Sequence, residues 1–464
     1  MKNKMKIAAI NCLNINSIID KHIELVTNPV TKGEIIEKDN KLVCVEEVIR
    51  EAKAAPRRSV LFHKYVYLLH LIIIRCITNK SYSTHLSYQV LTEVLGKHYT
   101  DMLQTLHKMR IIDVDTTYSI GNHSRRIVLI NKDVSFVITK NLKVIEYANK
   151  VDKFFSKNQK NELSKFDNNN FIKNYNKSLF LLELKDKDEA IKFISELNLK
   201  EEQFKYYYFK IESFSFDKKE IYTIDKNKRI YHYLTNLPRP LKSFFNIKFQ
   251  LDISNSHPLL FSKFIIDKYN INHNIINILL SISVPTYKAH YAGKQLYNIL
   301  NNNNIQFNKK ELPFDLLHFL YSTSKGIFWD NFVELFDNRL DRSIIKQRLF
   351  QEVFYSRKKK VTRYRPFAKL FRYYYPNVWK LIKEIKKDNP NDLPNMMMQQ
   401  ESGLFYSILQ KCYEKKWKVV NIHDAIIILD AKENDNIDVN EVRNIMEEVY
   451  TINNLHATIA IDEY

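Results

Sequence analysis

RLDRSIIKQRLFQEVFYS, residues 339–356, places Arg342, Lys346, Phe350 and Phe354 at intervals of four residues. On a helix, residues four apart lie above one another and share one face. Two cations followed by two aromatic side chains can hold a triphosphate and stack a base, which an enzyme that adds nucleotides must do. A solvated amphipathic helix with a cationic edge has the same spacing, so the choice between the two depends on the surrounding sequence.

One aspartate stands in an apolar, strand-like segment on either side of this stretch. Asp252 follows a short apolar run in FQLDISNSHPLLF, and Asp424 lies between two apolar runs in KWKVVNIHDAIIILD. A buried carboxylate is costly unless a charge neutralises it, and a hard divalent cation does so most directly. We therefore expect Asp252 and Asp424 to bind two Mg²⁺ ions, or Mn²⁺, for an in-line phosphoryl transfer. The alternatives are a helix cap or Asx-turn for Asp252 and a hairpin turn for Asp424.

In this order the three segments resemble the motifs of the family A DNA polymerases and of their relatives, the single-subunit phage-type RNA polymerases. Asp252 with Ser254 is similar to palm motif A, the helix that begins near Arg342 is similar to fingers motif B, and His423-Asp424 is similar to motif C. The resemblance covers about residues 220–430, roughly half of the chain.

The resemblance implies a role for each of these residues. Asp252 and Asp424 would be the catalytic metal ligands, and His423 would orient the primer terminus. Arg342 and Lys346 would hold the triphosphate as part of the catalytic machinery. The expected nucleotide-binding residues, from motifs A and B, are Arg342, Lys346, Phe350, Phe354, His257 and Ser254.

Two further segments resemble the same family. KNKRIYHYLTNLPRPLK, just before motif A, contains Arg229, which the resemblance implies would meet the template-primer. NMMMQQES, before motif C, contains Asn395 and Gln399, which would approach the primer minor groove. These three residues are therefore expected to bind nucleic acid.

The chain departs from the family at three positions. DNA polymerases of the family usually carry Glu five residues after the motif A aspartate, and this chain has His257 there. Motif C usually continues with Glu, which is Ala425 here, and motif B usually ends in Tyr-Gly, which is Phe354-Tyr355 here. These departures leave the choice between deoxyribose and ribose open.

The motifs themselves disagree about the sugar. The pattern of Asp252, Ser254 and Ser256 is closer to the RNA polymerases, whereas Phe350 is closer to the DNA polymerases. A bulky imidazole from His257 would obstruct a ribose hydroxyl, and Phe354 has no phenol that could bind one, so deoxynucleotides are favoured. The alternative for His257 is a residue that only caps the helix beginning near Pro258.

The composition agrees with a nucleic-acid enzyme. The 464-residue chain has 72 Lys+Arg against 52 Asp+Glu, a formal net charge of +20, which suits a polyanionic partner. Its six glycines argue against a glycine-rich phosphate loop. Its 28 Tyr and 28 Phe supply many groups that could stack on bases, although most will be ordinary core.

The sequence favours a cytoplasmic protein without a membrane partner. Its four cysteines are far apart and form no CxxC pair, which fits a reducing compartment. The apolar run from Ile7 to Ile10 is too short for a signal sequence. The stretch from Tyr65 to Ile74 contains His70 and reads as a buried helix.

Residues 58–134, after an N-terminal extension of residues 1–57, resemble a winged helix. Helices are expected over residues 60–77, 87–95 and 97–109, and strands over 111–115 and 127–130, around a turn at 119–122. The third helix would be the recognition helix, with Arg125 and Arg126 on the wing beside phosphates. The alternative is a scaffold that binds protein.

Residues 135–220 are charged, Asn-rich and helical in pattern, where the family has a thumb. They carry no catalytic constellation, and too little chain precedes motif A for both a thumb and a proofreading nuclease. After motif B, the run Arg357-Lys358-Lys359 is interleaved with nearby tyrosines. That run is either a solvated face or a template-binding segment.

The expected fold is therefore α+β: a right-hand polymerase palm with an antiparallel sheet and helical fingers in residues 221–464, preceded by a winged helix and a helical thumb-like segment. The expected protein is a compact DNA polymerase without proofreading, from a phage or mobile element, that acts in DNA replication on template-primer and nucleoside triphosphates. One alternative is a primase or RNA polymerase of the same fold. The other is a non-catalytic replication-initiator or defence protein that binds DNA.

Overall fold

The computed structural model divides into two compact units, each described here by itself. Unit 1 comprises residues 1–165 and 186–218, and unit 2 comprises residues 166–185 and 219–464. The residues that the structure describes are 5–10, 13–27, 30–38, 41–50, 54, 56–96, 99–115, 124–130, 133–139, 169–214, 223–271, 273–282, 289–302, 312–336, 340–356 and 365–464. The fold is mixed α+β, with many helices and several small antiparallel sheets.

Unit 1 is built around a long apolar helix, α2 (Arg58–Thr78), whose side chains Tyr65, Leu68 and Ile72 are fully buried. Among the described residues, α2 is the one helix long and apolar enough to cross a membrane, and 61% of its apolar stretch is buried inside the protein. The hydroxyl of Tyr65 lies 2.8 Å from Nδ1 of His22 in the neighbouring helix α1 (Ile15–Thr27). Helix α2 therefore serves as the core of this unit.

Two helices and a three-stranded antiparallel sheet pack beside α2. The strand order is β4–β6–β5, so the middle strand comes last in the chain. The elements in chain order are β4 (Ser83–Ser87), α3 (Tyr88–Leu95), α4 (Tyr99–Lys108), β5 (Ile112–Val114) and β6 (Ser124–Leu129). The helices and strands predicted for residues 60–130 are thus confirmed as elements, whereas β4 was not predicted and the predicted turn at 119–122 lies outside the described residues.

The remaining described elements of unit 1 are two antiparallel strand pairs and two helices. Antiparallel pairing joins β1 to β7, and β2 to β3. Asp186 caps α7 by accepting a hydrogen bond from the backbone N–H of Glu189. The bounds are β1 (Met5–Ile10), β2 (Val30–Lys38), β3 (Lys41–Arg50), β7 (Val134–Thr139), α7 (Lys187–Glu196) and α8 (Glu201–Ser213).

Unit 2 contains a four-stranded antiparallel sheet in the order β11–β12–β10–β13. Strands β11 (Val419–Ile422) and β12 (Ala425–Leu429) are buried along their whole length, which explains their continuous apolar runs. Strand β10 (Ile247–Ile253) pairs with both β12 and β13 (Ile459–Glu463). This sheet carries the aspartates at 252 and 424.

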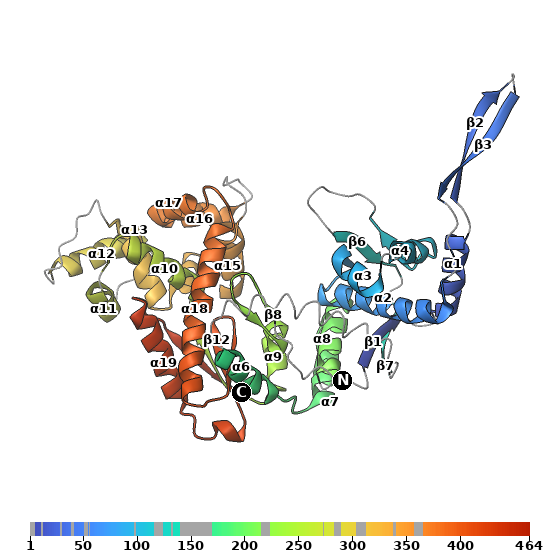
Figure 1. Ribbon diagram of the computed structural model, residues 1–464. Helices are drawn as coiled ribbons and strands as arrows, with labels where there is room; N and C mark the ends of the chain where they lie inside the picture. The colour runs from blue at the N-terminus through green and yellow to red at the C-terminus, as the bar shows by residue number, and fades with distance from the viewer. Residues whose placement is uncertain are drawn as a thin grey trace. The chain divides into compact units, whose positions relative to one another are not determined.

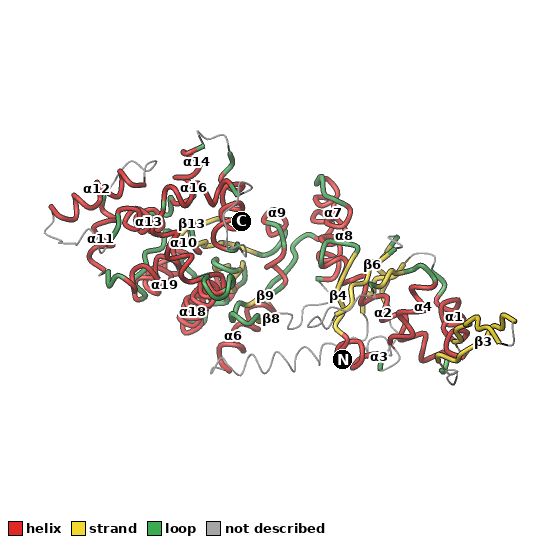
Figure 2. The backbone as a smooth tube through the Cα atoms, turned by 90° about the horizontal axis from the view of Figure 1, so that it is seen from above, coloured by secondary structure: helices red, strands yellow, loops and turns green. Residues whose placement is uncertain are grey.

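Helices α18 (Asp392–Glu414) and α6 (Asn169–Phe180) pack against the sheet. The long helix α18 contacts β11, α10 (Ser256–Lys268) and α19 (Val439–Ile452), and α6 contacts both β11 and α18. Figure 2, seen from above, shows α18 beside α19 and α10. The short elements nearby are β8 (Thr223–Ile224), β9 (Ile230–Tyr231), η1 (Tyr233–Asn236), α9 (Arg239–Lys242) and η3 (Lys432–Asn434).

The helical part of unit 2 is inserted in the chain between β10 and α18. Helix α13 lies at its centre and contacts α10, α11, α12, α14 and α17. This part occupies one end of the unit, away from α6 and α19 (Figure 1). Its further elements are α11 (His273–Ser281), α12 (Ala289–Asn302), α13 (Phe314–Ser324), α14 (Phe328–Leu335), α15 (Arg342–Leu349), η2 (Phe350–Phe354), α16 (Pro366–Tyr374) and α17 (Pro376–Ile385).

Candidate active site

The two aspartates lie at the same end of neighbouring strands. Asp252 is near the end of β10, where it pairs with Ala425, and Asp424 immediately precedes Ala425 in the turn between β11 and β12. The backbone N–H of Ile253 donates a hydrogen bond to the carbonyl of Asp424 at 3.0 Å. Residues 172 positions apart in the chain, 252 and 424, are therefore brought together by sheet pairing.

The electrostatics of the two carboxyl groups are coupled. Burial and the charge of Asp424 together raise the pKa of Asp252 to about 7, against the opposing charge of Lys346. Burial also raises the pKa of Asp424, together with the charge of Glu401, and Lys346 again acts in the opposite direction. Both carboxylates are thus costly to keep charged in the absence of a bound cation.

The backbone beside each aspartate is held in an unusual conformation. His423, directly before Asp424, has φ +53°, and Asn255, three residues after Asp252, has φ +56°. The left-handed region is uncommon for residues other than glycine and is often found at functional sites. His423 is the first residue of the two-residue turn that joins β11 and β12.

The carboxylate pair fits a magnesium site that a substrate completes. In the described part of the chain, no group of three or more His, Cys, Asp or Glu side chains could hold a metal ion by itself. Mg²⁺ is commonly bound by one or two carboxylates together with substrate phosphates, and it needs no all-protein cage. Asp252 and Asp424 are the residues of this site that could hold such an ion.

The motif B segment forms α15 followed by a π-helix. Lys346 is exposed, and its charge acts on both aspartates, whereas Arg342 forms a 2.8 Å ion pair with Asp330 of α14. In the π-helix η2, the N–H of Tyr355 donates to the carbonyl of Phe350, five residues earlier, at 2.7 Å. The π-turn shifts the helical phase by one residue after Phe350.

This shift reverses the expected roles of two neighbouring aromatic residues. Phe354, which was expected to face the nucleotide, is instead fully buried, with the rings of Phe328 and Phe371 at 6.3 and 5.8 Å. Tyr355 takes the position on the side of the carboxylates, and its ring lies 5.4 Å from that of Phe350. The inference that the site lacks a phenol was therefore wrong, because spacing in fours does not hold across a π-helix.

Lys386, which is half-buried, and Arg365, which is buried, form hydrogen bonds at the end of this helix. The ammonium of Lys386 donates to the carbonyls of Val353 and Ser356 at 2.7 and 3.2 Å, and burial lowers its pKa to about 7. The guanidinium of Arg365 donates to the carbonyl of Glu352 and to Oγ of Ser356. These bonds satisfy carbonyls that a helix end leaves without partners, so the helix end is fixed in place.

His257 is the centre of a hydrogen-bond network that joins four parts of unit 2. Its Nδ1 lies 2.7 Å from the hydroxyl of Tyr355, and its Nε2 lies 2.9 Å from Oε2 of Glu401. The guanidinium of Arg229 donates to the same carboxylate oxygen at 2.7 Å, and the ring of Phe350 meets the imidazole edge to face at 5.6 Å. His257 therefore does more than cap α10.

The network fixes the charges of its members. Burial opposes ionisation of Glu401, but the hydrogen bond and charge of His257, with Arg229, outweigh it and lower the pKa of Glu401. Burial also opposes the charge on Arg229, but Glu401 outweighs that and raises the pKa of Arg229. Glu401 was not singled out in the sequence, although it lies two residues after Gln399 in a segment already chosen.

The residues expected to hold the primer also lie together. The buried side chain of Asn227 donates to Oδ1 of Asn395 at 3.3 Å and accepts from Nε2 of Gln399 at 3.5 Å. The segment that carries Arg229 is thereby docked on α18. The ring of His423 lies 5.5 Å from that of Tyr231, and burial and the charge of Arg229 lower the pKa of His423.

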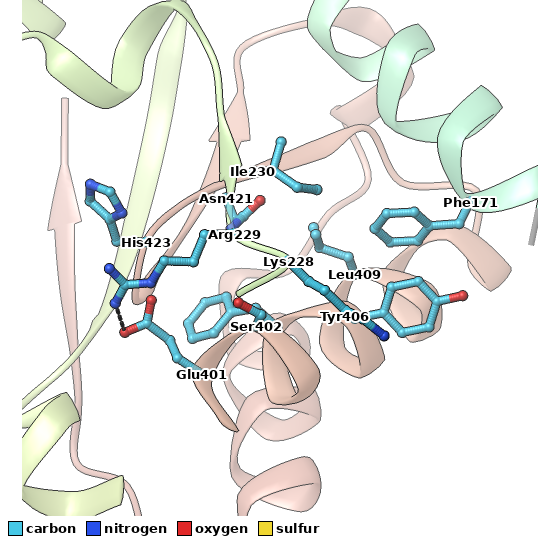
Figure 3. A pocket seen from close by; sticks show the side chains of 11 residues that line it. Phe171, Lys228, Arg229, Ile230, Glu401, Ser402, Tyr406, Leu409, Asn421 and His423 are labelled. Carbon is cyan, nitrogen blue, oxygen red and sulfur yellow. Dashed lines mark hydrogen bonds and ion pairs between the residues drawn. The ribbon is translucent and has the colours of Figure 1, made fainter. Parts of the chain in front are cut away.

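A small pocket opens beside this network. Figure 3 shows Arg229, Glu401 and His423 at one end of it and Phe171 and Tyr406 at the other. Three buried polar atoms that line it have no hydrogen-bond partner among the described residues: Nε of Arg229, Oε1 of Glu401 and Nδ1 of His423. Such atoms call for a polar partner from outside the chain.

The other predicted site residues are distributed as follows. The backbone N–H of Ser254, two residues after Asp252, donates to the carbonyl of Thr458 at 2.9 Å. Arg126 is exposed on β6 of unit 1. The side chain of Arg125 and all of Arg357, Lys358 and Lys359 lie outside the described residues.

No protein-family model matches this sequence, and no curated protein sequence matches it. The function of this chain is therefore inferred from the geometry of unit 2 and from the motif resemblance.

Proposed function

We propose that this chain is a magnesium-dependent nucleotidyltransferase, a DNA polymerase whose palm is the sheet β11–β12–β10–β13 and whose fingers are the helices between β10 and α18. The observation that carries the proposal is the carboxylate pair Asp252 and Asp424 on neighbouring strands, with the charge of Lys346 acting on both. A pair of buried carboxylates with a nearby cation is the arrangement that binds a metal–triphosphate complex.

The reaction forms one bond and breaks one bond. The 3′-oxygen of the primer attacks the α-phosphorus, the bond from that phosphorus to the oxygen bridging to the β-phosphate breaks, pyrophosphate leaves, and the hydroxyl proton passes to water. Two bound Mg²⁺ ions supply charge stabilisation of the attacking and leaving oxygens. Asp252 and Asp424 hold the metal–substrate complex, and Lys346 binds the triphosphate. Arg342 joins Lys346 by exchanging Asp330 for a phosphate.

The pair Tyr355 and His257 supports selection of deoxynucleotides. The hydroxyl of Tyr355 lies 2.7 Å from Nδ1 of His257, which fixes the position of the phenol. The two rings pack against that of Phe350, and the charge of Asp424 acts on Tyr355, so the bulk of the rings lies near the carboxylates. A site without room for the 2′-hydroxyl rejects ribonucleotides.

The pocket residues support binding of the primer terminus. Arg229, Glu401 and His423 leave polar atoms unsatisfied next to Asp424, and Asn395 and Gln399 extend the polar surface along α18. Donors and acceptors of this kind suit the minor-groove edge and the sugar of a terminal base pair.

Unit 1 supports a role in duplex DNA binding. Its order of helix, strand, two helices and two strands, with the sheet β4–β6–β5, is that of a winged helix. Arg126 is exposed on the strand that follows the wing. With the net charge of +20, we propose that this unit contacts phosphates.

Primer extension tests the proposal directly. The full chain is incubated with a primed template, Mg²⁺ and labelled dNTPs or NTPs, beside the variant Asp424→Asn. Template-directed extension with dNTPs that the variant lacks is the expected result. Extension with NTPs alone favours the primase or RNA polymerase alternative, and duplex binding without any nucleotide addition favours the non-catalytic DNA-binding alternative.

A further inference from the structure

A lysine that the proposed mechanism does not use lies beside the carboxylate pair. Lys242, the last residue of α9, is only 8% exposed. Burial lowers its pKa, and the charges of Asp252 and Asp424 act on it in the opposite direction. Within the described residues, its ammonium makes no hydrogen bond and no ion pair. The side chain is buried while its ammonium has no partner in the described part of the chain, which is the state expected of a group that a ligand completes.

The neighbouring cation on the same helix behaves differently. Arg239 forms a 2.5 Å ion pair with Asp462 of β13, and Asp462 pairs across the sheet with Gln250 of β10. Directly paired residues point to the same face of a sheet, as do residues two apart on one strand. Asp462, Gln250 and Asp252 therefore share one face, and Arg239 anchors α9 over it. The charge of Asp252 acts on Lys242, but among the described residues Lys242 forms no ion pair like that of Arg239.

The chemistry of the expected ligand follows from the charges. Once cations neutralise Asp252 and Asp424, the positive charge of Arg239 still acts on Lys242, and the charge of Lys346 acts on the same two aspartates. An anion with several charges is then needed to balance them. A triphosphate or pyrophosphate group provides those charges and accepts hydrogen bonds from an ammonium.

We propose that Lys242 is a phosphate-binding residue of the active site, which contacts the phosphates of the incoming nucleotide and of the leaving pyrophosphate from α9, as Lys346 does from α15. The inference rests on the proposed function, since a nucleotidyltransferase is what brings a polyphosphate to these carboxylates. It makes the triphosphate site a clamp of two lysines that lie 104 positions apart in the chain, 242 and 346.

The test compares Lys242→Met with the wild-type chain, with Lys242→Arg and with Lys248→Met. Methionine keeps the apolar stem and removes the charge. Lys248 lies on the same strand, β10, four residues before Asp252, and is the matched control. The measurements are KM for a dNTP, kcat, inhibition by inorganic pyrophosphate, and the rise in unfolding temperature on adding pyrophosphate with Mg²⁺.

Loss of one charge-assisted hydrogen bond predicts that KM and the inhibition constant of pyrophosphate both rise by about tenfold or more in Lys242→Met, with a smaller change in kcat. The stabilisation by pyrophosphate should shrink in parallel, Lys242→Arg should recover part of each effect, and Lys248→Met should match wild type. Values within twofold of wild type, or a fall in kcat with KM unmoved, overturn the inference.

The design separates this inference from the proposed function. If the wild-type chain extends no primer, the proposed function fails. In that case, if pyrophosphate stabilises the wild-type chain but not Lys242→Met, the result would still support a phosphate site at Lys242. If pyrophosphate stabilises both proteins equally, or neither, the phosphate site is overturned as well.

Discussion

The hydroxyl of Tyr355 lies 2.7 Å from Nδ1 of His257, and this contact exists because a π-helix precedes Tyr355. An uninterrupted α-helix would bring the residue four after Phe350 to this place, and that residue is a phenylalanine. The wider turn brings the tyrosine there and sends Phe354 into the core. A tyrosine–histidine pair, held by Glu401, thus lies near the carboxylate of Asp424.

This pair is expected to govern the choice of sugar. His257→Gly and Tyr355→Ala should each raise ribonucleotide incorporation relative to deoxynucleotides by about tenfold, the scale of a ~1–3 kcal/mol steric discrimination. The ratio of kcat/KM for matched NTP and dNTP, measured in single-nucleotide extension, checks this. A wild-type preference for NTPs, or a ratio that neither substitution moves, would contradict the assignment of the gate.

Phe354→Ala is the matched control and carries a prediction of its own. Because this ring is fully buried among Phe328, Trp329 and Phe371, its removal should cost about 3–5 kcal/mol of unfolding free energy. The ratio of sugar incorporation should stay at the wild-type value. Denaturant unfolding measures the first effect, and a loss below ~1 kcal/mol would mean that the ring is not in the core.

The two aspartates should be essential for catalysis but unfavourable for stability. Asp252→Ala and Asp424→Ala should each abolish nucleotide addition while the chain stays folded, since each removes a metal ligand. In EDTA, Asp252→Asn and Asp424→Asn should unfold at a higher temperature than wild type, because a buried like charge is removed. Turnover near wild type in either alanine variant would refute the palm assignment.

The pH dependence should follow the raised pKa of Asp252. Between its ordinary value of 3.8 and about 7, the folded protein binds more protons here than the unfolded chain. Without divalent ions, this contribution to stability is therefore present at low pH and is lost as the pH rises through that window. Asp252→Asn should flatten the unfolding temperature against pH over this range, and an unchanged profile would exclude the shift.

The same carboxyl group should make magnesium binding pH-dependent. Since the metal binds the ionised form, the Mg²⁺ concentration at half-maximal primer extension should increase as the pH falls below about 7. Magnesium titrations at several pH values between 6 and 8, at saturating dNTP, measure this. A half-saturation that does not vary with pH would count against Asp252 as a ligand.

Duplex DNA binding by the full chain should depend on Arg126. Arg126→Ala should weaken binding about equally for all sequences and reduce the slope of log affinity against log salt by about 1. Arg58→Ala, which removes an exposed arginine already paired with Asp20 at 2.6 Å, is the control. If both variants keep the wild-type slope, the protein-binding scaffold becomes the better account of unit 1.

Sequence patterns were sufficient where a feature is local. The apolar runs on either side of His423-Asp424 predicted the strands β11 and β12, and the apolar pattern of residues 60–77 predicted α2. Strand β4 was missed because its sequence, STHLS, is mostly polar and shows no alternation of apolar residues.

The partners within the site depend on long-range packing and could not be read in the same way. Glu401 meets His257 and Arg229 because α18 packs against α10 and the segment before β9, and the proposed role of Lys242 depends on the ion pair of Arg239 with Asp462. The sequence does not show that the helix between Phe350 and Phe354 is a π-helix. The spacing of four residues therefore predicted Phe354, and not Tyr355, as the residue at the site.

The π-helix also has a consequence for tracing the ancestry of this chain. Such a turn is an α-helix that has gained one residue, which leaves the flanking helix turns intact. A sequence pattern that requires Lys, Phe and Tyr at intervals of four residues finds Phe354 in place of the tyrosine and misses Tyr355. Its relatives should therefore be sought with a gap of one residue allowed between positions 350 and 355, and those without the inserted residue should carry tyrosine directly at the fourth position.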